Sequence, residues 1–101
     1  MRLSEQELSS IKLSFKKHFT PNDHLWLFGS RVDDTRKGGD IDLYVETELS
    51  AKDAVQAKIR FDADLMILIG EQRIDIVLNL VHDHTELQIY QIAKETGISL
   101  L

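Results

Sequence analysis

The 101-residue chain contains no cysteine, only one proline and no long apolar run. The absence of cysteine excludes a disulfide scaffold and a thiolate metal site, and it favours a reducing compartment such as the cytoplasm. No uninterrupted apolar stretch approaches the length of a membrane-spanning helix. A signal-peptide pattern is also missing, because Met1-Arg2-Leu3-Ser4 leads into a polar segment. We therefore expect a cytoplasmic protein that makes no contact with a membrane.

Basic residues are outnumbered by acidic ones. The chain has 12 Lys and Arg against 17 Asp and Glu, which gives a formal net charge of −5. A general nucleic-acid binder would present a basic face, so no direct binding of nucleic acid is expected. The acidic surface would instead suit a basic protein partner. With 43% hydrophobic and 29% charged residues, the composition is that of a soluble globular protein, and the length predicts a single domain over residues 1–101.

Hydrophobic periodicity predicts strands that alternate with helices. Ser4 and Glu7 form a capping-box pattern, which predicts a helix over 5–18. Asp83 is the predicted cap of a final helix. The remaining predictions are strands at 25–28, 41–45 and 73–80, and helices at 30–35, 50–69 and 84–96. The element order αβαβαβα indicates an α/β (α+β) domain.

The second and third predicted strands each have an apolar face and a polar face. Apolar residues alternate with Asp40 and Asp42 in one strand and with Asp75 in the other. This pattern predicts a small, mixed, three-stranded sheet with helices mainly on one face and the other face left open. Ser30 can meet Asp40 only if the end of the first strand lies beside the start of the second. We therefore expect those two strands to be antiparallel.

The acidic residues at the start of the second strand point to chemistry. Aspartate is a poor strand former, yet Asp40 and Asp42 stand one residue apart there, about 6.6 Å along the same face. Mg²⁺ needs only one or two such carboxylates together with substrate phosphates. Asp75, on the same face, could hold the second ion of a two-ion site or accept a proton. Gly29 and Ser30 stand where a short helix begins, and backbone N–H groups there can bind phosphate.

The pattern Gly-Ser-x9-Asp-x-Asp, with a later Asp in an apolar strand, resembles the DNA polymerase beta-type nucleotidyltransferase superfamily. Within it, the run from Phe28-Gly29-Ser30-Arg31 to Gly38-Gly39-Asp40-Ile41-Asp42-Leu43 is similar to minimal nucleotidyltransferases, the MNT proteins. The similarity covers about residues 24–80, and the helix end Ala93-Lys94-Glu95-Thr96-Gly97 is similar as well. The chain departs from the family in Arg31-Val32-Asp33-Asp34, where many members carry a small residue followed by Arg-Gly.

The resemblance implies a polymerase beta-like nucleotidyltransferase fold and a Mg²⁺-dependent enzyme that uses ATP. It implies Asp40, Asp42 and Asp75 as catalytic metal ligands, and Gly29 with Ser30 as the nucleotide-binding residues. Many MNT proteins are antitoxins of HEPN-domain ribonuclease toxins, and the family mechanism transfers AMP to a tyrosine of the toxin. A stable hetero-oligomer with a HEPN partner is therefore expected, since 101 residues leave no second lobe to hold an acceptor.

Two other functions fit the same residues. One is a non-catalytic antitoxin that neutralises its partner by steric binding, and the other is a small-molecule nucleotidyltransferase of the antibiotic-modifying type. Structural roles are preferred for the other polar and aromatic candidates. Arg31, Arg36 and Lys37 are expected to form a basic surface loop, and His82, Asp83 and His84 a solvated turn. Trp26 and Phe28 are expected to make core or partner contacts, and Tyr44 and Tyr90 to pack.

Overall fold

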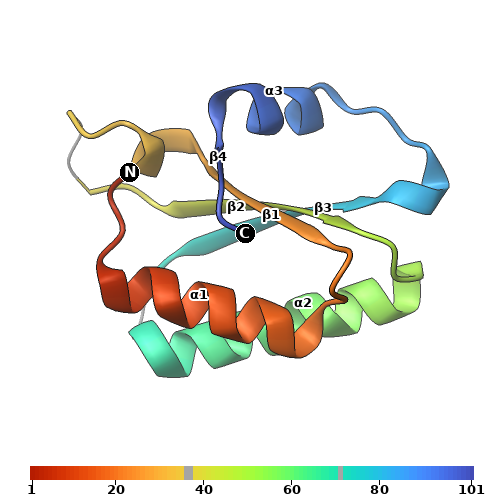
Figure 1. Cartoon of the computed structure of the whole chain (residues 1–101), viewed down its shortest axis with the longest axis horizontal. Coiled ribbons are helices and arrows are strands. Elements are labelled where there is room, and N and C mark those ends of the chain that lie inside the picture. Colours follow the sequence, from red (N-terminus) through yellow and green to blue (C-terminus); the bar gives the residue numbers. More distant parts are fainter. Residues whose placement is uncertain (36–37, 71) are drawn as a thin grey trace.

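A computed structural model of the chain describes residues 1–35, 38–70 and 72–101; the predicted loop residues Arg36 and Lys37 lie outside these ranges. The elements are α1 (Glu5–His18), β1 (His24–Phe28), the 3-10 turn η1 (Gly29–Val32), β2 (Ile41–Thr47), α2 (Ala51–Ile69), β3 (Ile74–Leu80), the 3-10 turn η2 (Val81–Asp83), α3 (Gln88–Thr96) and β4 (Ile98–Ser99). Figure 1 shows α1 and α2 on one side of the sheet and α3 on the other. No helix among the described residues has the length and apolarity to cross a membrane.

The sheet is mixed and has the strand order β3-β2-β1-β4. As predicted, β1 is antiparallel to β2, whereas β2 and β3 run parallel. The prediction of three strands is wrong, because β4 adds a fourth at the edge of β1. Trp26 pairs with Ser99 and Leu27 with Ile98. A two-residue strand is too short to show alternation, so only its partner makes it recognisable.

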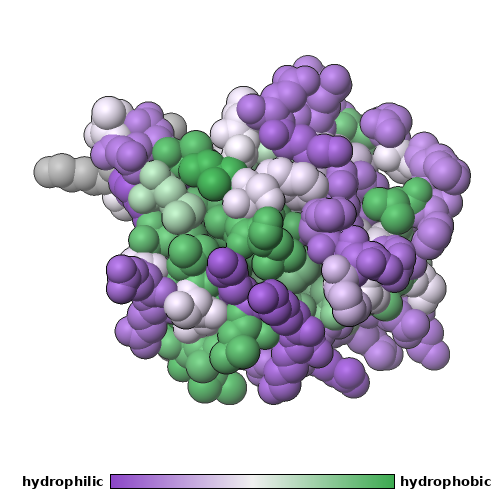
Figure 2. Space-filling view, in the orientation of Figure 1, coloured by the Kyte–Doolittle hydropathy of each residue, from purple (hydrophilic) through white to green (hydrophobic). Residues whose placement is uncertain are grey.

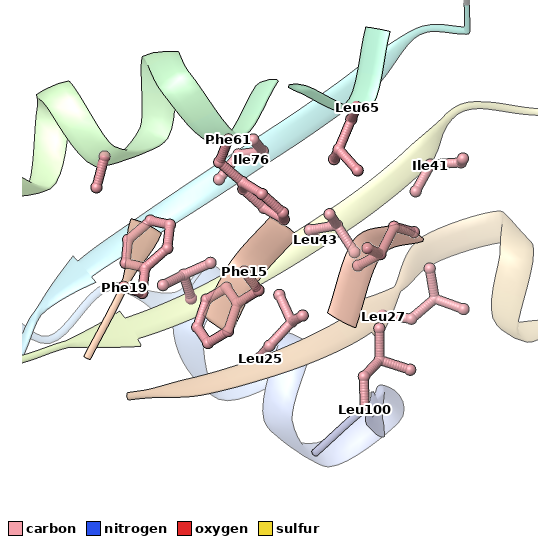
Figure 3. Packing of buried hydrophobic residues seen from close by; sticks show 13 residues of the cluster. Phe15, Phe19, Leu25, Leu27, Ile41, Leu43, Phe61, Leu65, Ile76 and Leu100 are labelled. Atoms are coloured by element: carbon pink, nitrogen blue, oxygen red, sulfur yellow. The ribbon is translucent and has the colours of Figure 1, made fainter. Parts of the chain in front are cut away.

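The main core lies between the sheet and the two helices on one face. Phe15 of α1 packs edge-on against Phe61 of α2, with ring centroids 5.8 Å apart. Figure 3 shows these side chains pointing toward the inward-facing residues of the strands. Leu25 and Leu43 are fully buried there. The apolar face predicted for the second strand is therefore confirmed.

The opposite face is not left open along its whole length, which corrects the predicted arrangement. α3 covers part of it, and Tyr44 is fully buried there beneath Tyr90, with ring centroids 5.6 Å apart. Burial raises the pKa of the Tyr44 hydroxyl, which stays protonated and donates to Glu46 Oε2 at 2.7 Å. This second core contains Trp26, Phe28, Tyr44, Val77, Tyr90 and Ala93. The aromatic residues predicted to pack do so. They make half of this sheet face apolar, and α3 covers that half and buries it.

Two predicted helices begin or end elsewhere. α3 begins at Gln88 rather than at 84, and its N-cap Leu87 makes no side-chain hydrogen bond, so Asp83 is not its cap. η2 and the left-handed His84, with a φ of 54°, occupy the intervening turn. The helix predicted at 30–35 is the shorter 3-10 turn η1. In both places the polar residues of a 3-10 turn resemble the first turn of an α-helix.

The first helix offers a direct test of its predicted cap. Ser4 Oγ accepts from the Glu7 N–H at 3.0 Å, and Glu7 Oε1 accepts from the Ser4 N–H at 2.8 Å. We expect Ser4→Ala to lower the free energy of unfolding by about 1 kcal/mol, because the Glu7 N–H loses its side-chain acceptor. Urea denaturation measures the change. Ser9→Ala, at an exposed position inside the same helix, is the control; equal losses in both variants would contradict the capping role.

Candidate active site

The end of β1 and the starts of β2 and β3 meet at one end of the sheet. Phe28 pairs with Asp42, and Asp42 pairs with Asp75 on the parallel neighbour. Paired residues on adjacent strands lie about 4.8 Å apart and share a face. Asp40 stands just before β2, two residues from Asp42. The structure therefore brings the three predicted aspartates together on the face opposite the main core.

Gly29 packs directly against the Asp42 carboxylate. Its φ is +76°, and a Cβ at this position would overlap Asp42 Oδ2 and lie 3.1 Å from Asp42 Cγ. Ser30 is placed in the same way, because a Cβ on Gly39 would overlap its Oγ. Only glycine permits both approaches. Two glycines thus allow η1 and the loop after it to close on the aspartates and on each other.

The site concentrates negative charge. Partial burial, and then the charges of Asp75 and Asp40, raise the pKa of the Asp42 carboxyl above its usual value. The Arg73 guanidinium opposes this effect. Its Nε lies 3.5 Å from Asp40 Oδ2 and 4.0 Å from Asp75 Oδ2. The Arg73 side chain is 75% exposed, so it is free to move when another cation or a phosphate enters.

Arg73 was not predicted as a site residue, although the sequence carried a signal for it. It stands two residues before Asp75, so it projects from the same side of the chain as that aspartate. A cation in that position can bridge Asp40 and Asp75.

Arg31 and Arg2 hold the loop after β1 in place. Arg2 Nη2 donates to Ser30 O at 2.8 Å, and Arg2 Nε donates to Asp33 O at 2.8 Å. Arg31 Nη1 donates in turn to Arg2 O at 2.8 Å, and its Nη2 to Gln72 Oε1 at 3.3 Å. Arg31, predicted to lie on the surface, is instead half-buried and ties the N-terminal segment to the loop beside the aspartates.

The histidines lie away from these acids. His82 and His84 are exposed in and after η2, which follows the C-terminal end of β3, whereas Asp75 lies near its start. Asp83 between them is exposed too. Their placement agrees with the solvated turn predicted for this segment.

The donor set of the site suits Mg²⁺. The described part of the chain forms no group of three or more His, Cys, Asp or Glu that could hold a metal ion. Mg²⁺ keeps several waters, however, and binds through one or two carboxylates plus substrate phosphates. Burial and then repulsion from Asp75 and Asp40 raise the pKa of Asp42, and a divalent cation would relieve that repulsion. Asp40 and Asp42, with Asp75 beside them, are the residues that would hold it.

No protein-family model matches the chain, and no curated protein matches its sequence. Function must therefore be inferred from the site. The site contains three aspartates, a glycine turn packed on Asp42, and Arg73 between Asp40 and Asp75. Together these groups can bind a cation and a polyphosphate.

Proposed function

We propose that the protein is a metal-dependent nucleotidyltransferase of the polymerase beta-like fold. It transfers AMP from ATP to a tyrosine hydroxyl of a HEPN-domain ribonuclease toxin and acts as the antitoxin of that toxin. The observation that carries the proposal is the meeting of the Gly29-Ser30 turn with Asp40, Asp42 and Asp75 at one end of the sheet. Nucleotidyl transfer needs such parts, because it depends on positioning and charge neutralisation rather than on a covalent enzyme group.

Each residue has a role in this proposal. Asp40 and Asp42 hold Mg²⁺, which when bound neutralises charge on the triphosphate and on the leaving pyrophosphate. Gly29 lets the phosphates approach the backbone, and the Ser30 hydroxyl and nearby N–H groups donate to phosphate oxygens. Asp75, whose side chain is 51% exposed, adds a metal ligand or accepts the proton of the attacking hydroxyl.

The openness of the site favours a protein as the acceptor. The side chains of Asp40 and Asp75 are 42% and 51% exposed, so a hydroxyl carried on another surface can reach them. A small-molecule acceptor would need walls around it to be positioned. The net charge of −5 also suits a basic partner surface.

The test is transfer of label from ATP. Wild-type protein, Mg²⁺ and the product of the neighbouring gene are incubated with ATP labelled at the α-phosphate or at the γ-phosphate. We expect the partner to acquire α-label but no γ-label, on a tyrosine identified by mass spectrometry. Asp40→Ala/Asp42→Ala should abolish the transfer, and Asp62→Ala on α2 should leave it unchanged.

Each failure of this experiment has its own meaning. A tight complex without label would support a steric antitoxin. Neither label nor complex would favour a small-molecule enzyme, to be examined with aminoglycosides as acceptors. Equal labelling by wild type and by Asp40→Ala/Asp42→Ala would show that these aspartates take no part in the reaction.

A further inference from the structure

β3 forms one edge of the sheet, and no strand of the described chain pairs with its outer side. It is seven residues long and contains neither proline nor lysine, two residues that commonly protect such edges. The Ile41 N–H donates to Arg73 O at 3.0 Å, so every second residue from Arg73 onward bonds toward β2. The other backbone groups of β3 point outward; they belong to Ile74, Ile76, Leu78 and Leu80. The Leu78 carbonyl accepts from the Tyr90 hydroxyl at 3.1 Å and keeps a second lone pair.

The sequence of β3 is complementary to itself when two copies run antiparallel. A two-fold axis at Val77 pairs apolar residues with apolar residues, Ile74 with Leu80 and Ile76 with Leu78. It sets Asp75 opposite Asn79, so no carboxylate faces another. The apolar pairs are those whose N–H and C=O groups point outward, as the hydrogen-bonded pairs of an antiparallel ladder require. A shift of two residues in either direction shortens the overlap.

An apolar stripe on α2 lies beside this edge. Val55, Ile59 and Met66 are 51%, 62% and 60% exposed. Val55 lines a cavity of about 270 Å³ together with Leu78 and Leu80 of β3. Met66 follows Val55 by eleven residues, which is three helical turns, so both lie on the same side of α2; the half-buried Asp62 stands between Ile59 and Met66 on that side. The two-fold axis that pairs the β3 strands would bring two such stripes together.

We propose that two copies of this chain form a dimer through antiparallel pairing of their β3 strands about Val77. The two four-stranded sheets then join into one, and on one face Val55, Ile59 and Met66 of the two α2 helices contact their counterparts. On the opposite face, Asn79 of the second copy lies across from Asp75. The two Asp75 residues are then about 13 Å apart along the strand direction, so both acidic sites open on one surface. This assembly stands independently of the proposed transfer reaction.

The first test measures association by sedimentation equilibrium. We expect a dimer at micromolar concentration, and Ile59→Lys/Met66→Lys should weaken it by roughly 100-fold, because the lysines must be buried or the stripes must part. The matched control is Leu13→Lys/Ile67→Lys, since Leu13 and Ile67 are also exposed, at 69% and 82%, elsewhere on the helices. A wild-type monomer at 100 µM, or equal weakening by both variants, would overturn the proposal.

The second test examines the register. The chain has no cysteine, so Val77→Cys creates a unique thiol on the two-fold axis. Opposed residues in a non-hydrogen-bonded antiparallel pair have Cα atoms about 4.5 Å apart, within the range of a disulfide. We expect copper-phenanthroline to convert this variant to a covalent dimer, and Ser99→Cys on the opposite edge to remain monomeric on a non-reducing gel. Equal cross-linking of the two variants would overturn the pairing.

Discussion

Replacing Asp42 by asparagine is expected to lower nucleotidyl transfer by roughly 10³-fold while making the folded protein more stable at neutral pH. Activity falls because Asp42, which we propose as a metal ligand together with Asp40 and Asp75, loses its charge. Stability rises because the same carboxylate is partly buried beside two others of like charge. Opposite changes in activity and stability are typical of a residue retained for chemistry rather than for folding.

The gain in stability should depend on pH. Because the pKa of Asp42 is raised in the folded state, its protonated form stabilises the wild-type fold below the ordinary carboxyl pKa of about 3.9. This contribution is lost as the pH rises from there through the raised folded-state value. The difference in unfolding free energy between Asp42→Asn and wild type should therefore grow over that interval and level off above it.

Thermal unfolding from pH 3 to pH 8, alongside transfer assays at pH 7, measures both effects. Asp62→Asn on α2 provides the control, since it removes one negative charge away from the acidic cluster. A lower Tm for Asp42→Asn at every pH would show that the carboxylate stabilises the fold. Full activity of the same variant would show that the carboxylate takes no part in the reaction.

Gly29→Ala is expected to reduce transfer by roughly 10²-fold, which is the effect of displacing a catalytic group by about 1 Å. The new Cβ would overlap Asp42 Oδ2, so the carboxylate must leave its present position between Asp40 and Asp75. The positive φ of +76° adds a cost of about 1–2 kcal/mol in folding free energy for any residue with a Cβ.

Gly70→Ala separates these two effects. Gly70 has a φ of +83°, similar to that of Gly29, but among the described residues beyond its chain neighbours no atom lies within 4 Å of a Cβ placed there. We expect a comparable loss of stability by urea denaturation and unchanged transfer. Equal activity in Gly29→Ala and Gly70→Ala would mean that close packing on Asp42 does not matter to the reaction.

Local patterns were sufficient where they were long or chemically distinctive. α1 has the bounds that its capping box and period predicted, and α2 ends before Gly70 as expected. Alternation in the second and third strands correctly placed Asp42 and Asp75 on the face away from the main core. These features depend on residues only two to four positions apart, which the sequence displays directly.

Contacts between distant segments account for what the patterns missed. Leu27 and Ile98 are far apart in the chain, and their pairing alone makes a strand of two C-terminal residues. α3 covers Tyr44 because half of that sheet face is apolar. Neither the sequence of β2 nor that of α3 indicates that these two elements pack together. The approach of Gly29 to Asp42 and of Arg73 to Asp40 likewise exists only after the strands pair. Short segments carry too little periodicity to specify their partners, so packing in three dimensions has to select them.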